Sequence, residues 1–184
     1  MNSGFHLTLM IGPVVPVPVP QEVLDALTSL SVTTNSDSGS GFQLEFTLSN
    51  RSPLQTIFLL SGGAPIPLVR VLIIITVNGK ADVLMDGVMT NHEIRPGADA
   101  THSVLTVTGE DLSRVMDYID FSGFPFPGMP PEARVALILL KYAFLGILPL
   151  VIPSVLIDIP IPTDRIPVQK GKDLGYIRSL ADEV

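Results

Sequence analysis

The chain has 184 residues and no cysteine, and its eleven basic and eighteen acidic residues give a formal net charge of −7. This length is enough to bury the core of one ordinary domain, or of one domain and part of a second. The lack of cysteine excludes disulfides and thiolate metal sites. Because the acidic excess is spread along the chain, it argues against a nucleic-acid-binding surface and favours protein as the partner.

The N-terminal quarter predicts strands separated by proline and turn residues. Residues 5–11 (FHLTLMI) alternate as a β-strand does, and the proline-valine repeat after them predicts an extended polyproline-type arm. Residues 20–30 predict a short helix or helical turn, and residues 36–41 (SDSGSG) predict a turn. Residues 41–49 (GFQLEFTLS) place four apolar side chains on one face, which predicts a half-buried antiparallel strand. Residues 54–63 fit a helical turn and a strand equally well.

A predicted hairpin follows. Residues 71–77 are apolar and rich in β-branched side chains, and Asn78-Gly79 after them is the strongest short hairpin signal. A second strand is expected over residues 81–94 and a third over residues 103–108. Consecutive short strands with tight turns favour an antiparallel barrel or sandwich over a parallel sheet.

The strand at residues 71–77 is apolar on both faces, and only one face of a strand in a small barrel packs inward. Two kinds of cover for the second face remain open. One is a helix of the same chain around residues 135–145, and the other is a neighbouring subunit. Leu72, Ile74 and Val77 are the candidate subunit-contact residues.

Gly109 separates the third strand from a helical pattern. The apolar residues with helical spacing are Leu112, Val115, Met116 and Ile119. The pattern predicts a helix with Glu110 and Asp111 at its N-terminal end, where the helix dipole favours carboxylates. Asp117 and Asp120 are expected on a solvated face, because no metal-ligand spacing recurs around them.

Residues 133–159 form an apolar segment that is nearly long enough to cross a bilayer. Lys141 lies inside it, Pro149 and Pro153 interrupt its second half, and no basic cluster flanks it. A buried helix followed by a buried strand is therefore the favoured interpretation. The alternative is a membrane-associated or lipid-binding module built on residues 133–159.

The sequence contains no recognisable catalytic motif. The nucleophile elbow G-x-S-x-G, the metalloprotease motif H-E-x-x-H, the phosphate loop and the dinucleotide fingerprint are all missing. His92 stands beside Glu93 at a predicted strand end, whereas His6 and His102 are isolated. We therefore expect no enzymatic activity, no cofactor and no metal site.

Three motifs follow one another in the middle of the chain, namely DGVMT at residues 86–90, SVLTVTG at 103–109 and DLS at 111–113. In this order they resemble the first barrel of hub proteins of contractile injection systems and phage tails, the late control gene D proteins and VgrG-type spikes. Residues 5–49 resemble the hub of phage-tail-like particles. Residues 168–184 (VQKGKDLGYIRSLADEV) resemble the family's q-x-G-x-D-L-x-Y-hydrophobic-x-x-L-A helix.

The resemblance implies a mainly β fold (β plus α), an antiparallel tube-like β-barrel with flanking helices. It implies a barrel domain with an N-terminal extended arm at residues 1–120. A helix-strand-helix connection that begins a second hub domain is implied at residues 121–184. Members of the family continue into a second barrel, so this chain resembles an N-terminal portion or a split hub.

The function that the resemblance implies is mechanical: a structural component of the spike base that adapts the hexameric inner tube to a trimeric spike. The implied partners are two further copies in a homotrimer, the inner tube protein, and spike tip and baseplate proteins. Neither nucleic-acid binding nor stable membrane insertion is expected. The expected location is the cytoplasm, within a phage-tail-like particle, and release of that particle from the cell is left open.

Overall fold

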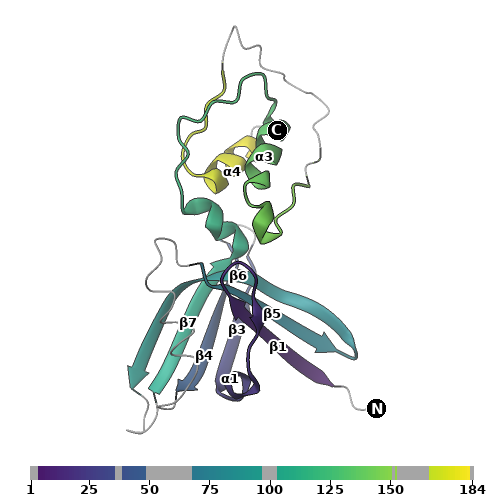
Figure 1. Cartoon of the computed structure of the whole chain (residues 1–184), viewed down its shortest axis with the longest axis vertical. Coiled ribbons are helices and arrows are strands. Elements are labelled where there is room, and N and C mark those ends of the chain that lie inside the picture. Colours follow the sequence, from purple (N-terminus) through teal and green to yellow (C-terminus); the bar gives the residue numbers. More distant parts are fainter. Residues whose placement is uncertain are drawn as a thin grey trace. The chain divides into compact units, whose positions relative to one another are not determined.

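The computed structural model describes residues 4–35, 39–48, 68–96, 103–150, 152 and 166–182. The chain divides into two compact units, residues 1–114 and residues 115–184. The first unit contains the β-sheet, and the second contains the two longest helices (Figure 1).

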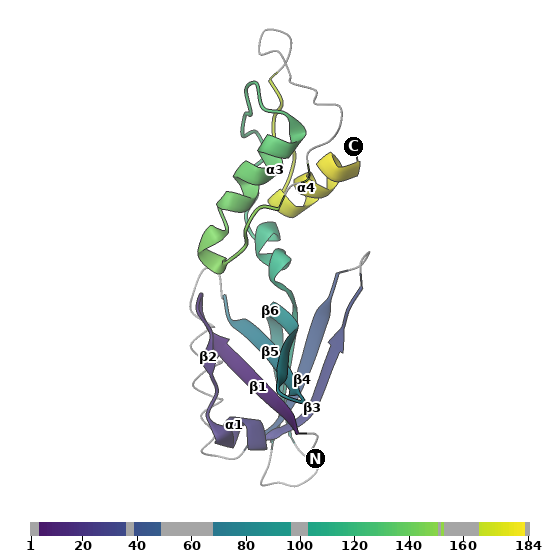
Figure 2. The same ribbon diagram turned by 90° about the vertical axis from the view of Figure 1, so that its right-hand side faces the viewer.

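The first unit is built on one antiparallel sheet. Its elements are β1 Phe5–Gly12, β2 Val17–Pro18, α1 Gln21–Asp25, β3 Leu27–Thr33, β4 Gly41–Leu48, β5 Arg70–Val77, β6 Lys80–Pro96 and β7 Ser103–Asp111. The seven strands lie in the order β2-β1-β5-β6-β7-β4-β3. The sheet curls into a half-barrel, with β1 and β2 on one side and β3 and β4 on the other (Figure 2). The prediction of a mainly antiparallel β fold with a few helices is confirmed.

The core lies on one face of this sheet. Phe42, Leu44, Phe46 and Leu48 alternate along β4 and are all buried, as their spacing predicts. The residues that pack with them from other elements are Leu9, Ile11, Val23, Val69, Val71, Ile73, Met85, Met89, Leu105 and Val107. Each fully buried side chain of this size contributes about 1.5–3 kcal/mol relative to an exposed one.

The predicted hairpin between β5 and β6 is confirmed. Asn78 and Gly79 both have positive φ angles, 53° and 81°, as a type I′ turn requires. The turn places Val77 opposite Lys80 and sets the register of the hairpin. β6 then continues to Pro96 and pairs with β7.

Two N-terminal expectations need correction. The predicted helix at residues 20–30 is limited to α1, because Leu30 pairs with Leu44 as part of β3. Serine, threonine and valine follow Leu27, and this composition favours a strand over a second helical turn. The proline-rich segment, expected as an extended arm, also contributes a short strand, because β2 pairs with β1 at the edge of the sheet, where proline is tolerated.

Gly109 does not end its strand, because β7 continues to Asp111. A Cβ atom on Gly109 would overlap the Phe42 ring and the carbonyl oxygen of Val88, and one on Gly87 would overlap the carbonyl oxygen of Glu110. The two glycines therefore allow β6 and β7 to run close together beneath the Phe42 ring.

The helix predicted after β7 is present as a short 3₁₀-helix, η2 Leu112–Asp117, and Glu110 and Asp111 belong to the end of β7. The Asp111 carboxylate accepts a hydrogen bond from the backbone N–H of Ser113 at 2.9 Å and from that of Ser40 at 3.3 Å. Asp111 thus caps the start of η2 and also ties it to the loop before β4.

The second unit contains α3 Pro131–Leu140, the 3₁₀-helix η3 Ala143–Leu145 and α4 Asp173–Asp182. Bridges between Asp120 and Lys172 and between Pro125 and Val168 join the segment before α3 to the segment before α4. The helix predicted within residues 133–159 is present as α3, and no helix in the described part of the chain is long and apolar enough to cross a bilayer. The segment 54–63, residues 36–38 of the predicted turn and most of the strand expected after α3 lie outside the described residues.

Candidate functional site

The predicted subunit-contact residues Leu72 and Ile74 lie on the face of β5 that is turned away from the core. Val71 and Ile73, which alternate with them, have no exposed surface. Leu72 pairs with Met10 on β1, and Ile74 pairs with Val83 on β6. Met10, Leu72, Ile74 and Val83 together form an apolar surface, called the outer strand face below. Val83 is its most exposed member, at 60%.

Val77, the third predicted contact residue, is separate from this surface. It shares strand parity with Val71 and Ile73, so it belongs to the core-facing side of β5. It lies at the tip of the strand beside Phe5, and both side chains are exposed, at 42% and 69%. The structure therefore brings Leu72 and Ile74 together and places Val77 at the hairpin end.

An ion pair borders the outer strand face. Arg70 on β5 donates two hydrogen bonds to the carboxylate of Asp86 on β6, at 2.8 and 2.6 Å, and a third to the carbonyl oxygen of Val14 at 3.3 Å. The hydrogen bond with Asp86 is the main cause that raises the pKa of Arg70. This planar two-bond geometry fixes the orientation of both side chains and holds the proline-rich segment against the sheet.

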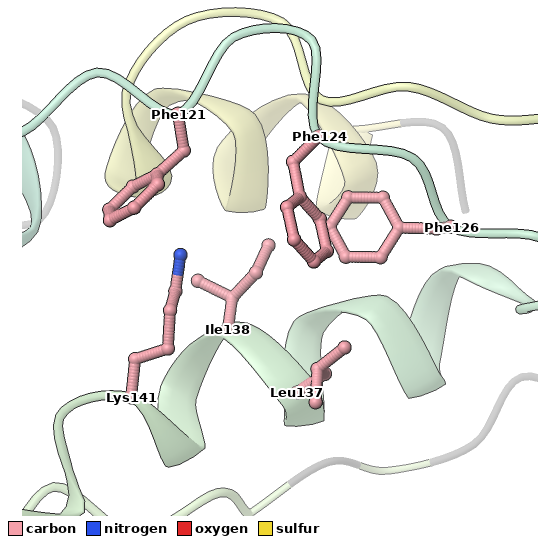
Figure 3. Close-up of a pocket in the computed structure, with 6 residues that line it drawn as sticks. All are labelled: Phe121, Phe124, Phe126, Leu137, Ile138 and Lys141. Atoms are coloured by element: carbon pink, nitrogen blue, oxygen red, sulfur yellow. The ribbon is translucent and has the colours of Figure 1, made fainter.

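The second unit contains an apolar pocket of about 180 Å³. Its lining residues are Phe121, Phe124, Phe126, Leu137, Ile138 and Lys141 (Figure 3). Phe124 and Phe126 meet edge to face, with ring centroids 5.1 Å apart and planes at 65°. On the other side of Ile138, the Lys141 ammonium lies over the Phe121 ring, 3.8 Å from its centroid (Figure 3).

A buried polar cluster adjoins this pocket and centres on Asp173, which has no exposed surface. Its Oδ2 atom accepts hydrogen bonds from the Tyr142 hydroxyl at 2.7 Å and the Lys141 ammonium at 2.6 Å. Its Oδ1 atom accepts one from the Gln169 amide at 2.5 Å. The carboxylate therefore joins the start of α4 to the end of α3 and to the segment before α4.

The aromatic residue Tyr176 extends this cluster. Its hydroxyl accepts a hydrogen bond from the buried Arg134 guanidinium at 2.9 Å, and its ring stacks on Phe126 at 5.9 Å. Gln169, Asp173 and Tyr176 occupy polar positions of the motif recognised near the end of the sequence, and Leu180, another motif position, is also buried. In this chain the motif holds the second unit together.

Tyr142 is predicted to make the stability of the second unit depend on pH in the alkaline range. Burial, with the hydrogen bond to Asp173 as the second cause, raises the pKa of the Tyr142 hydroxyl above its ordinary value near 10. An unfolded chain then loses this proton at a lower pH than the folded chain does. The resulting stabilisation is present below about pH 10 and is lost as the pH rises through the folded-state value.

We expect the free energy of unfolding to fall between pH 9 and pH 11, and to fall less steeply in Tyr142→Phe. Urea unfolding followed by far-UV circular dichroism at each pH measures both slopes. Equal slopes in Tyr142→Phe and wild type would contradict the assignment.

The cluster residues contributed by α3 and its end, Arg134, Lys141 and Tyr142, were not predicted as site residues. Lys141 could have indicated this cluster, because it is a single lysine within an apolar segment. A charge in a buried segment needs a partner of opposite charge or a hydrogen-bond acceptor. The partner of Lys141, Asp173, is 32 positions later in the chain, and no local pattern connects the two.

The two histidines in the described part of the chain, His6 and His92, lie far apart in the sequence and on different strands. Within the described residues, no group of three or more histidine, aspartate or glutamate side chains is arranged to hold a metal ion. Glu93 bonds with Arg95 at 2.8 Å, which lowers the pKa of this exposed carboxylate. His92 and His6 lie on exposed parts of β6 and β1, and His102 lies outside the described residues.

Neither a family model nor a curated protein matches the chain. Several solved structures are similar to it at low sequence identity, and three of them are described here. In the half-lidded Francisella PdpA-VgrG complex, the match has 14% identity and a TM-score of 0.51, over 98% of this chain and 28% of that chain. The lidless PdpA-VgrG complex matches with 16% identity and a TM-score of 0.46, over 82% of this chain and 28% of that chain.

The third is the tail protein from Neisseria meningitidis MC58, with 11% identity and a TM-score of 0.43, over 76% of this chain and 34% of that chain. This chain therefore spans about a third or less of each matched chain. At 14% identity, the match to the half-lidded complex gives evidence about the fold alone. Over nearly its whole length, this chain shares the fold of a chain in the Francisella PdpA-VgrG complex.

Proposed function

We propose that this protein is a structural component of the hub, or spike base, of a contractile phage-tail-like injection system. In this role it adapts a hexameric inner tube to a trimeric spike, and it acts mechanically, without catalysis. The observation that carries the proposal is the shared fold with a chain of a PdpA-VgrG complex over 98% of this chain. The proposed place of assembly is the cytoplasm.

The positions of the hub-like motifs support this proposal. Gly87 and Gly109 lie where a Cβ atom would overlap neighbouring groups, and Asp111 caps η2. Asp173 and Tyr176 hold the second unit together. Each of these motif residues meets a specific geometric need, so their common order with the hub family is consistent with a common backbone.

The outer strand face supports a role in assembly. A closed ring requires that one surface of each copy meets a different surface of its neighbour. Leu72 and Ile74 present apolar side chains on the non-core face of a sheet, and burial against a neighbouring copy would remove them from water. Partners of this surface are proposed to be a second copy of the chain and the inner tube protein.

The substitution Ile74→Lys is expected to reduce ring assembly by at least about tenfold, because a lysine buried without a partner loses its hydration. The full chain is mixed with its inner tube protein, and the fraction of threefold rings is counted by negative-stain electron microscopy. Thr106→Lys is the matched control. It also faces away from the core, but its β4 and β6 neighbours, Glu45 and Glu93, accommodate a cation.

Two results would contradict these assignments. Wild-type chain that stays monomeric with the tube protein argues against the hub role. Rings of Ile74→Lys at wild-type abundance argue against the outer strand face as the contact. Thermal unfolding of both variants must match wild type within a few degrees, so that the comparison reports assembly and not folding.

Liposome flotation separates the hub role from the lipid-binding alternative. We expect the full chain to remain at the bottom of the gradient with vesicles of phosphatidylcholine and phosphatidylglycerol. Flotation with the vesicles would instead favour the membrane-associated or lipid-binding module built on residues 133–159.

A further inference from the structure

We propose that the pocket in the second unit receives one aromatic side chain from a partner polypeptide, and that an acidic residue beside this side chain in the partner pairs with Lys141. The proposal adds a recognition site to the chain and does not depend on ring assembly. It is built from the size of the pocket, the arrangement of its rings and the charged group of Lys141 among the described lining residues.

The size of the pocket suits a single ring. Ligand pockets for drug-sized molecules are about 300–1,000 Å³, whereas an apolar cavity of about 150 Å³ binds benzene. At about 180 Å³, the pocket has room for one phenyl or phenol group and little more. A side chain that a partner inserts is therefore a better match than a larger free ligand.

The lining of the pocket also suits an aromatic ring. Phe124 and Phe126 already form an edge-to-face pair, and aromatic rings favour this arrangement or offset stacking with a further ring. Phe124 is 50% exposed and Leu137 is 38% exposed, so apolar surface of the pocket remains in contact with water. An inserted ring would bury this surface.

The surface around the pocket favours a polypeptide as the source of the ring. Leu137, Leu140 and Phe144 follow one another at helical spacing along α3 and η3, and their exposed fractions are 38%, 55% and 62%. This apolar strip shares Leu137 with the pocket, so a segment that fills the pocket can continue along the strip. A single small molecule would leave the strip exposed.

The positive charge of Lys141 favours an acidic residue next to the inserted aromatic side chain of the partner. Lys141 contributes the charged group of the pocket, and its side chain is 35% exposed. An ammonium group has three N–H donors. The carboxylate of Asp173 accepts one, and the Phe121 ring faces the ammonium from another side. Asp173 also accepts hydrogen bonds from Tyr142 and Gln169, so Lys141 can donate a hydrogen bond to a second carboxylate without leaving Asp173 unsatisfied.

Methyl NMR of the full chain, with labelled isoleucine and leucine, tests the proposal. The probes are three capped tetrapeptides: Gly-Phe-Asp-Gly, Gly-Phe-Asn-Gly and Gly-Ala-Asp-Gly. We expect the phenylalanine-aspartate peptide to shift the Leu137 and Ile138 methyl signals. The asparagine peptide should bind about threefold to tenfold more weakly, because it lacks the charge, and the alanine peptide should cause no shift at 10 mM.

Leu137→Trp fills the pocket and is expected to weaken binding of the phenylalanine-aspartate peptide at least tenfold, as read from the Ile138 methyl signal. Ala181→Trp is the matched control, because this exposed residue of α4 belongs neither to the pocket lining nor to the apolar strip. It should keep the wild-type affinity. The dispersion of the remaining methyl signals verifies that both variants are folded.

Three outcomes would overturn the proposal: no shift with the phenylalanine-aspartate peptide at 10 mM, equal affinity for the alanine peptide, or unchanged binding in Leu137→Trp. A fourth is binding of 3-phenylpropionate where the peptides do not bind, which would assign the pocket to small aromatic acids. None of these results bears on threefold ring assembly, so the hub role and this site can fail separately.

Discussion

Asp173→Asn is expected to lower the free energy of unfolding of the second unit by about 2–4 kcal/mol. The wild-type carboxylate has no exposed surface and accepts hydrogen bonds from Lys141, Tyr142 and Gln169. Asparagine removes the negative charge and turns one acceptor into a donor that faces other donors. Because about a third of the Lys141 side chain is exposed, water relieves part of the cost, so the estimate lies below that for a fully buried pair.

Tyrosine fluorescence during urea unfolding measures this loss in the right part of the molecule. The three tyrosines, Tyr118, Tyr142 and Tyr176, all lie in the second unit, and the chain contains no tryptophan. Asp182→Asn, on an exposed position of α4, is the matched control and should change the free energy by less than about 0.5 kcal/mol. An effect of Asp173→Asn as small as that of the control would show that the cluster does not stabilise the unit.

Gly109→Ala is expected to destabilise the first unit by about 3 kcal/mol. The added methyl group would overlap the Phe42 ring and the carbonyl oxygen of Val88. The ring can turn aside only by disturbing the core, and the carbonyl belongs to the backbone of the neighbouring strand β6. The strands β6 and β7 must therefore separate, which strains their hydrogen-bond ladder.

Urea unfolding followed by the β-sheet signal in far-UV circular dichroism measures this effect. Gly4→Ala is the control, because nothing lies within 4 Å of its Cβ position. Phe42→Leu should cost less in the Gly109→Ala background than in wild type, since a smaller side chain relieves part of the overlap. An unchanged unfolding midpoint in Gly109→Ala would contradict the close approach of β6 and β7.

Local pattern was sufficient to predict much of the sheet. The alternation of Phe42, Leu44, Phe46 and Leu48 predicts β4 and its buried face, because side chains of a strand point to opposite sides with a period of two. Asn78-Gly79 predicts the hairpin, because a type I′ turn needs two positive φ angles. Both are properties of residues that are close together in the chain. The mainly antiparallel β fold follows from such signals.

Other features depended on contacts between distant segments. Glycine is common where a strand ends, so Gly109 was expected to end its strand. It is instead an interior residue of β7, because Phe42, far away in sequence, occupies the space where a side chain would lie. Leu30 has helical spacing with the residues before it, yet its pairing with Leu44 makes it part of β3. In both cases a long-range contact outweighs a weak local preference.

The outer strand face and the pocket with its polar cluster also differ in how much of each could be predicted from the sequence. The sequence grouped Val77 with Leu72 and Ile74, and only the folded sheet separates Val77 from the other two. An apolar outer face of β5 could be identified from the sequence, because a strand that is apolar on both faces must present one face away from its own core. The Phe121–Lys141 pocket and the Asp173 cluster could not, because their members come from three segments that only the folded second unit brings together. Periodicity within a segment therefore determined the strands, whereas packing between segments decided the members of the outer strand face, the pocket, the buried charges and the roles of the glycines.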